Sequence, residues 1–304
     1  MGALRVTQGI VLSRLLTNIQ DQSKRILDLQ TQLSTGLRVN TVSDNPVDAR
    51  RAMNTRSTIA KNQQYIDNMS TAAPQLEGAV SSIQTMLDAV ARARELTLSG
   101  ANGTEGQAAL DAIAEEVNQI LEGAVNTANH QEGNLYIFGG THTRTKAYEV
   151  TRDVDGDITA VTYQGNSERI SVAVADGVSV RVTEPGSTLF QGSQDVFQTL
   201  IDIRDALLAG DQSVLQNQSL DELETVRGQL TQGMSRLGAV QNRLTTLNND
   251  TEDFQIQLEE LLSDSRDADF ADVILRLNAQ SNAFQAALSA AARVIQPSLL
   301  DYVS

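Results

Sequence analysis

Few residues of this chain combine a reactive side chain with the spacing that a chemical site requires. The two histidines, His130 and His142, are of the type that serves as a general base or a metal ligand. They flank an expected strand at residues 135–138, and neither has metal-ligand spacing or an acidic partner nearby in the sequence. We therefore interpret both histidines as exposed loop residues.

Three alternating aspartates, Asp153, Asp155 and Asp157, resemble part of a calcium-binding loop. Such a loop needs a glycine at its sixth position and a closing glutamate at its twelfth. Gly156 comes too early and the closing glutamate is missing, so a hairpin turn is the better interpretation. The segment 136–140 lacks the lysine of a phosphate-binding loop. The sequence thus predicts no catalytic residue, no cofactor and no metal site, and an enzyme is the least favoured class.

Composition narrows the choice of partners. The 304 residues carry a formal net charge of -15. This charge would repel the phosphates of nucleic acid, and no basic helix or long apolar stretch indicates a membrane partner. The chain has no cysteine, which excludes disulfides and thiolate chemistry. The first residues do not resemble a cleavable signal, so we expect any secretion to use another route.

Both ends of the chain carry apolar residues at the heptad spacing of paired helices. The first stripe consists of Leu12, Leu15, Ile19, Ile26, Leu29 and Leu33, with the polar Gln22 inside it. The second consists of Phe270, Ile274, Leu277, Phe284, Leu288, Ala291 and Ile295, with Ser281 as its polar member. A narrow stripe buries little area until a partner covers it. We therefore predict that these stripes form an assembly interface and become fully ordered on association; the alternative is a pair of ordinary core helices in one folded monomer.

Charge also distinguishes the two ends. Residues 1–38 contain five basic and two acidic residues, a net of +3, whereas residues 250–304 contain ten acidic and three basic residues, a net of -7. We expect the two ends to attract each other.

Helix signals continue inward from both ends. Asn45 is expected to cap a helix that begins at Pro46 and that Pro74 kinks or interrupts. A turn at residues 99–103 and a capping box of Thr104 and Gln107 are expected to start the next helix. Apolar heptads from residue 223 to residue 261 predict a long coiled-coil helix, whose glycines, including Gly233, let neighbouring helices approach closely.

The apolar period changes to two after residue 135. Strands are predicted at residues 148–151, 158–163, 169–174 and 178–182. Asp155-Gly156 and Asp176-Gly177 lie between them and favour type I′ hairpin turns. Glycines at 139 and 140 and the Pro185-Gly186 pair mark the limits of this segment.

Together these patterns predict a mainly α protein with a small β domain, in which the N- and C-terminal segments form a long antiparallel helical rod, or coiled coil, around a β-rich insertion. We divide it into an N-terminal assembly helix and loop (1–45), the N-terminal half of the rod (46–134), the small β domain (135–190), the C-terminal half of the rod (191–265) and a C-terminal assembly helix (266–304).

Four segments carry a more specific signal. LSTGLRVNTVSDNPVDARRAM at 33–53, RARELTLSGANGT at 92–104, RLGAVQNRL at 236–244 and DADFADVILRLNAQSNAFQAALSAAARVIQ at 267–296 resemble flagellins and their hook-associated relatives. The middle segment, 135–190, is similar to the hook-associated branch of that family. The motifs occur in the family's order and at both ends of the chain.

The resemblance implies a structural subunit of the bacterial flagellum at the hook–filament junction, outside the cell after type III export without signal cleavage. It implies self-assembly in a helical ring, neighbouring hook-associated and filament subunits as partners, and an export chaperone on the helix from Phe270 to Ile295. A flagellin that builds the filament is the first alternative. A coiled-coil adhesin or other binding module is the second.

Overall fold

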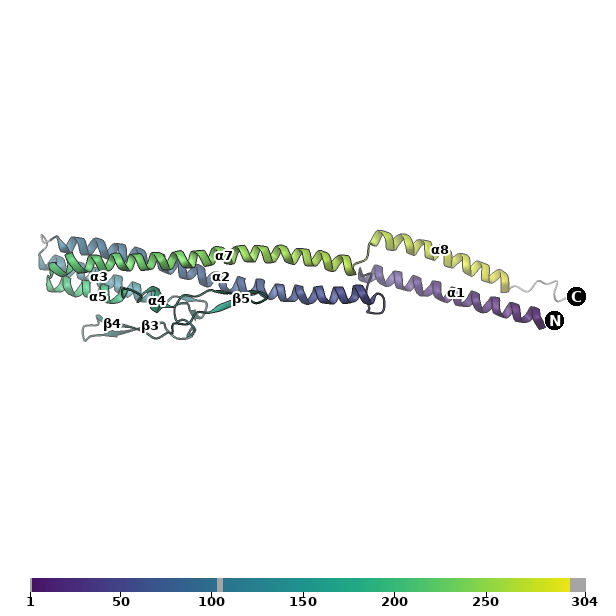
Figure 1. The fold of residues 1–304 in the computed structure, drawn as a ribbon, viewed down its shortest axis with the longest axis horizontal. Coiled ribbons are helices and arrows are strands. Elements are labelled where there is room, and N and C mark those ends of the chain that lie inside the picture. The colour runs from purple at the N-terminus through teal and green to yellow at the C-terminus, as the bar shows by residue number, and fades with distance from the viewer. Residues whose placement is uncertain (1, 103–105, 296–304) are drawn as a thin grey trace. The chain divides into compact units, whose positions relative to one another are not determined.

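The computed structural model describes residues 2–102 and 106–295, without the side chains of residues 2–9, 11, 12, 294 and 295. The chain divides into two compact units, one made of residues 1–61 and 254–304 and the other of residues 62–253. Long helices and a small set of antiparallel strands make up the described residues, which confirms the predicted mainly α fold with a small β region (Figure 1).

The first unit contains the two terminal helices. Helix α1 spans Gly2–Thr35 and packs along helix α8, Phe270–Ile295 (Figure 1). The two helices are antiparallel, because the backbone N–H of Ala268, just before α8, donates to the carbonyl of Gly36, just after α1, over 2.9 Å. The same unit contains the beginning of α2 (Pro46–Ala101) and the end of α7 (Leu220–Arg266).

Helix α2 begins as the sequence predicts. The Asn45 side chain accepts hydrogen bonds from the backbone N–H groups of Val47 (3.1 Å) and Asp48 (3.2 Å), which satisfies donors that the first turn leaves free. The expected interruption at Pro74 is wrong, because α2 continues through it to Ala101. Buried neighbours, among them Met69 and Leu76, anchor the helix on both sides of the proline. Their packing outweighs the single hydrogen bond that proline removes.

The second unit begins with an α-helical hairpin. Helix α3 (Gln107–Ala128) lies antiparallel to the second half of α2, and an ion pair of 2.7 Å joins Arg92 to Glu116. The predicted capping box is wrong: Gly106 occupies the N-cap, so Gln107 is the first residue of the helix and not the third after the cap, and its amide donates to Asp111. Thr104, its other member, lies outside the described residues.

Helix α7 confirms the predicted heptads. Leu223, Leu230, Leu237 and Leu244 are all buried within the second unit. There α7 runs beside α2, since the Asn62 amide donates to the Thr251 carbonyl over 2.8 Å. Of the glycines, Gly233 permits a close approach: a Cβ atom there would lie 2.5 Å from Leu189 Cδ2.

Six strands follow α3 in the chain. They are β1 (Gln131–Glu132), β2 (Leu135–Tyr136), β3 (Tyr148–Arg152), β4 (Ile158–Tyr163), β5 (Ser171–Ala175) and β6 (Val178–Arg181). They form three two-stranded antiparallel sheets, β1–β2, β3–β4 and β5–β6. The predicted strand pairs are thus confirmed, with boundaries shifted by one or two residues in three of the four strands.

The predicted type I′ turns are wrong. A type I′ turn needs positive φ at both central residues, but among the described residues only glycines have positive φ, including Gly156 (φ 96°) and Gly177 (φ 68°). Both hairpins also contain a register shift. Such a bulge changes the turn geometry, so the aspartate before each glycine keeps a negative φ.

Short helices close the second unit after β6. They are α4 (Gly186–Leu189), α5 (Val196–Ala209), α6 (Gln212–Val214) and a π-helical turn (Leu215–Ser219) that leads into α7. Buried rings of Phe138, Tyr148, Phe190 and Phe197 gather between strands and helices with centroid separations of 4.9 to 6.2 Å. Packing among these four aromatic rings therefore attaches the small β region to the helices.

Candidate assembly interface

The N-terminal stripe faces the C-terminal helix. Leu15, Ile19, Ile26, Leu29 and Leu33 are all half-buried along one side of α1. A single neighbouring helix covers only part of such a stripe, which is why none of these five side chains is fully buried. Leu12 lies in the same helix, but its side chain is outside the described part of the chain.

The C-terminal stripe divides into a covered and an uncovered part. Leu277 and Phe284 are half-buried in α8, on the side where Val273 and Ala291 are buried.

Three other members of this stripe remain exposed in the isolated chain. They are Phe270, which is 53% exposed, Ile274 at 46% and Leu288 at 44%. The Ile295 side chain lies outside the described residues. The side that α1 covers is thus turned slightly from the stripe that the heptads indicate, because Val273 takes the place of Phe270 and Ile274.

Further apolar side chains of the first unit point to solvent. Leu275 of α8 is 71% exposed, and Leu16 and Leu27 of α1 are about half exposed. Exposed large apolar side chains that recur on paired helices mark a surface that another protein can cover. The terminal helices therefore retain apolar surface after they have packed on each other.

A polar corner fixes where α1 and α8 meet. It comprises residues 36–39 and 264–268. Gly36 ends α1 with a φ of 73°, and the backbone N–H groups of Arg38 and Val39 both donate to the Arg266 carbonyl. The guanidinium of Arg38 contacts the Asp48 carboxylate at 3.0 Å and donates to the Ser265 carbonyl over 2.9 Å. One arginine thus connects the end of α1, the start of α2 and the end of α7.

Sequence reasoning missed this corner. Its partners are separated by more than 200 residues, so no local periodicity indicates them. The loop beside it is held by Asp44, which accepts hydrogen bonds from the backbone N–H groups of Asn40 and Thr41. The hydrogen bond from the Thr41 backbone N–H lowers the pKa of the Asp44 carboxyl most, and the hydrogen bond from the Thr41 hydroxyl lowers it further. Asp44 and Asp48 both lie in the segment 33–53 that resembles flagellins, and this resemblance was the one sequence feature that could have pointed to the corner.

The candidate chemical residues lie in the second unit. His142 is exposed, as expected, but His130 is half-buried. The His130 ring lies close to Gly78 of α2: a Cβ atom added to Gly78 would be 3.4 Å from His130 Nε2. The three aspartates form a hairpin turn: Asp153 Oδ1 accepts from the backbone N–H groups of Asp155 (3.0 Å) and Asp157 (2.9 Å). This confirms the turn interpretation.

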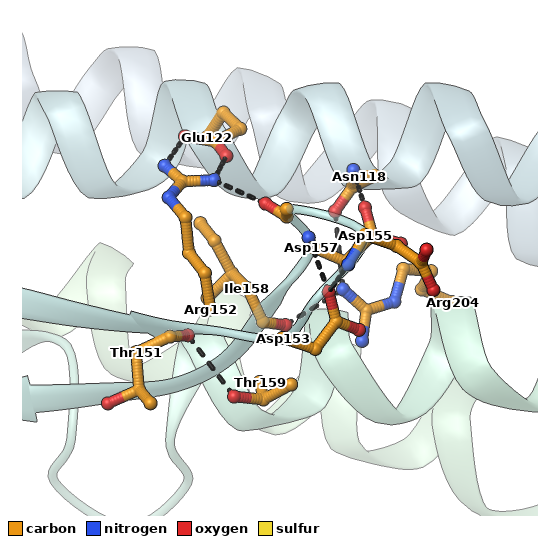
Figure 2. A network of polar contacts seen from close by, with 11 residues as sticks. Asn118, Glu122, Thr151, Arg152, Asp153, Asp155, Asp157, Ile158, Thr159 and Arg204 are labelled. Atoms are coloured by element: carbon orange, nitrogen blue, oxygen red, sulfur yellow. Dashed lines mark hydrogen bonds and ion pairs between the residues drawn. The ribbon is translucent and has the colours of Figure 1, made fainter.

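Figure 2 shows how the β3–β4 hairpin is held on the helices. Asn118 of α3 donates to Asp157 over 2.8 Å, and the buried Arg204 of α5 donates to the Ile158 carbonyl over 2.8 Å. Arg152 pairs with Glu122 of α3, and this hydrogen bond lowers the pKa of the Glu122 carboxyl. The polar residues here satisfy one another and serve to attach the hairpin.

The described residues offer neither a metal site nor a membrane span. Within residues 2–102 and 106–295, histidine and acidic side chains form no group of three or more that could hold a metal ion. No helix in the described part of the chain is both long and apolar enough to cross a bilayer.

Family comparisons match the two ends of the chain. The model of the bacterial flagellin N-terminal helical region matches residues 7–143, and that of the bacterial flagellin C-terminal helical region matches residues 220–303. These two regions contain the predicted stripes and the polar corner.

Two curated relatives are both named Flagellar hook-associated protein 3. The protein from Salmonella typhimurium is 26% identical over 179 residues, which cover 58% of this chain and 56% of that protein. The protein from Escherichia coli K12 is 24% identical over 188 residues, covering 62% of this chain and 57% of that protein. The chain therefore spans little more than half the length of the curated relatives that it matches.

Solved structures share the fold. Bacillus cereus FlgL aligns with a TM-score of 0.58 and 25% identity, covering 69% of this chain and 99% of that structure. The flagellar junction protein FlgL from Legionella pneumophila aligns with a TM-score of 0.59, covering 71% of this chain and 100% of that structure. Its identity of 14% supports a common fold alone.

Proposed function

Because the chain belongs to the bacterial flagellin family, we propose that it is a structural subunit of the flagellum that joins the hook to the filament. Two relatives carry the name of a hook-associated protein, which supports this position over that of a filament subunit. The observation that carries the proposal is the pair of terminal helices, which pack on each other and still expose apolar side chains.

In this proposal the terminal stripes are the assembly interface. Phe270, Ile274 and Leu288, uncovered in the single chain, become buried between neighbouring copies in a helical ring. The heptad spacing of Leu12 and Ile295 predicts that they belong to the same interface. Contacts of this kind join unlike surfaces of identical subunits, so repetition builds a helix or ring instead of a closed two-fold dimer.

The other partners follow from the same position. Hook-associated and filament subunits are the expected neighbours on either side of the ring. An export chaperone that covers α8 in the cytoplasm would prevent its apolar surface from aggregating before type III export. The proposed destination is the flagellum outside the cell. The proposed division of labour keeps residues 1–45 and 266–304 for assembly, residues 46–134 and 191–265 for the rod, and residues 135–190 for the outward-facing β domain.

Removal of α8 tests the proposal. A chain that lacks residues 270–304 is produced in a flagellated bacterium whose own gene for this chain has been deleted, and the amount of chain on isolated hooks is measured by immunoblot. We expect the full chain to be retained on hooks and to restore filaments, and the truncated chain to be absent. As a control, Val154→Ser changes a fully exposed residue of the β3–β4 hairpin, far from α8 in the sequence. Incorporation of the truncated chain at the full level would refute the role of α8.

A further inference from the structure

The first unit carries two faces of opposite charge outside the terminal helices. Residues 46–61, at the start of α2, contain four basic residues and one acidic residue. Residues 254–266, at the end of α7, contain Glu259, Glu260 and Asp264, while their single arginine, Arg266, pairs with Asp267. We call the solvent side of residues 46–61 the basic face and that of residues 254–266 the acidic face.

The basic face occupies the outer side of α2. Arg50 and Lys61 are exposed and eleven residues apart, about three helical turns, so they lie on one side of the helix. Ser57 lies between them on the same side and is also exposed. Ala52 and Thr55, on the opposite side, are buried.

The acidic face occupies the outer side of α7. Gln257, Glu260 and Asp264 follow each other at intervals of three and four residues and are all exposed. Leu258 and Ser265, on the other side of this helix, are buried. The exposed, like-charged pair Glu260 and Asp264 has a spacing that destabilises an isolated helix.

The two faces point in opposite directions. Arg38 holds the start of α2 and the end of α7 side by side through Asp48 and the Ser265 carbonyl. Because the two helices bury their inner sides within this unit, their charged outer sides face away from each other. A unit with a positive side and an opposite negative side is suited to head-to-tail stacking of identical copies.

Asp48 pairs with Arg38, and Glu259 accepts a hydrogen bond from Gln255, but the other charges of the two faces lack a partner in the described part of the chain. Among the residues that the structure describes, the side chains of Arg50, Arg51, Arg56 and Lys61 form no ion pair or hydrogen bond, and the same holds for the carboxylates of Glu260 and Asp264. This set differs from the corner and from the β3–β4 hairpin, where arginines are paired with carboxylates.

We propose that the basic face of one copy binds the acidic face of the next copy, as a lateral contact separate from the terminal stripes. This inference rests on the proposed function, because it assumes that copies assemble side by side. Exposed apolar residues next to the charges, Met53 on α2 and Ile256 on α7, add area to the contact. The charges set the direction of stacking, since two basic faces or two acidic faces repel each other.

Paired charge reversals test the contact. Arg50→Glu/Lys61→Glu gives a chain with two acidic faces, and Glu260→Lys/Asp264→Lys gives a chain with two basic faces. Each change replaces attraction by repulsion at two positions. We therefore expect the amount of each variant on isolated hooks, when it is produced alone, to be at least about tenfold lower than that of the wild-type chain. Co-expression of the two variants should restore retention, because unlike faces then alternate.

A control separates local from general charge effects. Arg181→Glu/Arg243→Glu makes the same change of net charge as Arg50→Glu/Lys61→Glu, at two exposed positions of the second unit. This control should be retained like the wild-type chain. Thermal melting of each purified variant checks that the fold is intact. Retention of both face variants at the wild-type level, or loss without rescue on co-expression of folded variants, overturns the inference.

Cross-linking tests the geometry directly, because the chain has no cysteine of its own. Ser57→Cys and Gln257→Cys place one thiol on each face. Oxidation of hooks that carry the double variant should give a ladder of multimers, whereas each single variant should give none. Dimers from Ser57→Cys alone would show a symmetric contact and overturn the head-to-tail arrangement. If the wild-type chain itself is absent from hooks, the proposed function fails; if it is present and the ladder is absent, this inference alone fails.

Discussion

The substitution Leu288→Asp separates assembly from folding. Leu288 lies in α8 and is 44% exposed in the isolated chain. An aspartate there can keep its charge in water as long as the chain is alone. In the proposed ring the same position is covered by a neighbouring copy, and the carboxylate would then lose its water without gaining a cation.

The size of the effect follows from this exposure. Full burial of a leucine side chain stabilises by about 1.5 to 3 kcal/mol. The exposed share of Leu288 therefore leaves about 0.7 to 1.3 kcal/mol for the contact with a neighbour. Burying an unpaired carboxylate costs several kcal/mol more. A total of about 3 to 5 kcal/mol per subunit would weaken each association step by about two to nearly four orders of magnitude.

One assay measures assembly and a second measures folding. Retention on isolated hooks should fall below detection, while thermal melting of the second unit, residues 62–253, should stay at the wild-type temperature. Leu230→Asp is the matched control: Leu230 is buried in that unit, so the same change should lower its melting temperature. If Leu288→Asp lowers the melting of the second unit together with retention, the terminal helices are ordinary core. If retention is unchanged, Leu288 faces solvent in the assembly.

Three further predictions concern the second unit. The Tyr148 hydroxyl is buried without a hydrogen-bond partner among the described residues, so Tyr148→Phe should raise stability in a denaturant titration by about 1 kcal/mol; a loss of that size would reveal a hidden partner. Gly233→Ala should lower stability by about 1 to 3 kcal/mol, because its Cβ would lie 2.5 Å from the buried Leu189; an unchanged melting temperature would contradict the close packing. The pKa of Glu122 is lowered by its hydrogen bond from Arg152, so its stabilising effect exists above the unfolded value of 4.5 and is lost as pH falls through the folded value; amide exchange in β3–β4 should quicken there, and Glu122→Gln should remove this dependence.

Local repetition made much of the fold predictable. Leucine occupies five of the six heptad positions from Leu223 to Leu258 in α7, and a repeat of this length can be recognised without knowing which helix it packs against. The Asn45 cap and Pro46 were equally local, because the hydrogen bonds of a cap join residues two or three positions apart. These two local predictions are confirmed, whereas three others that also used only neighbouring residues, the interruption at Pro74, the capping box before α3 and the type I′ turns, are wrong.

Predictions that depended on distant contacts were less accurate. The α8 heptads indicate a stripe through Phe270 and Ile274, but the sequence cannot say which side of that stripe α1 covers, and Val273 is the buried residue. Pro74 reads locally as a helix breaker, yet packing on both sides of it maintains α2. Arg38 gave no local signal, because its partners in α7 are more than 200 positions away.

Electron microscopy of detached filaments, with gold-labelled antibody against the β3–β4 hairpin, measures where the chain resides. A subunit that joins hook to filament should place one cluster of label at the hook-proximal end of each filament and none along its length. Label along the whole filament would identify a filament subunit. Label on the cell body, with bare filaments and hooks, would contradict a role of the terminal helices in the flagellum.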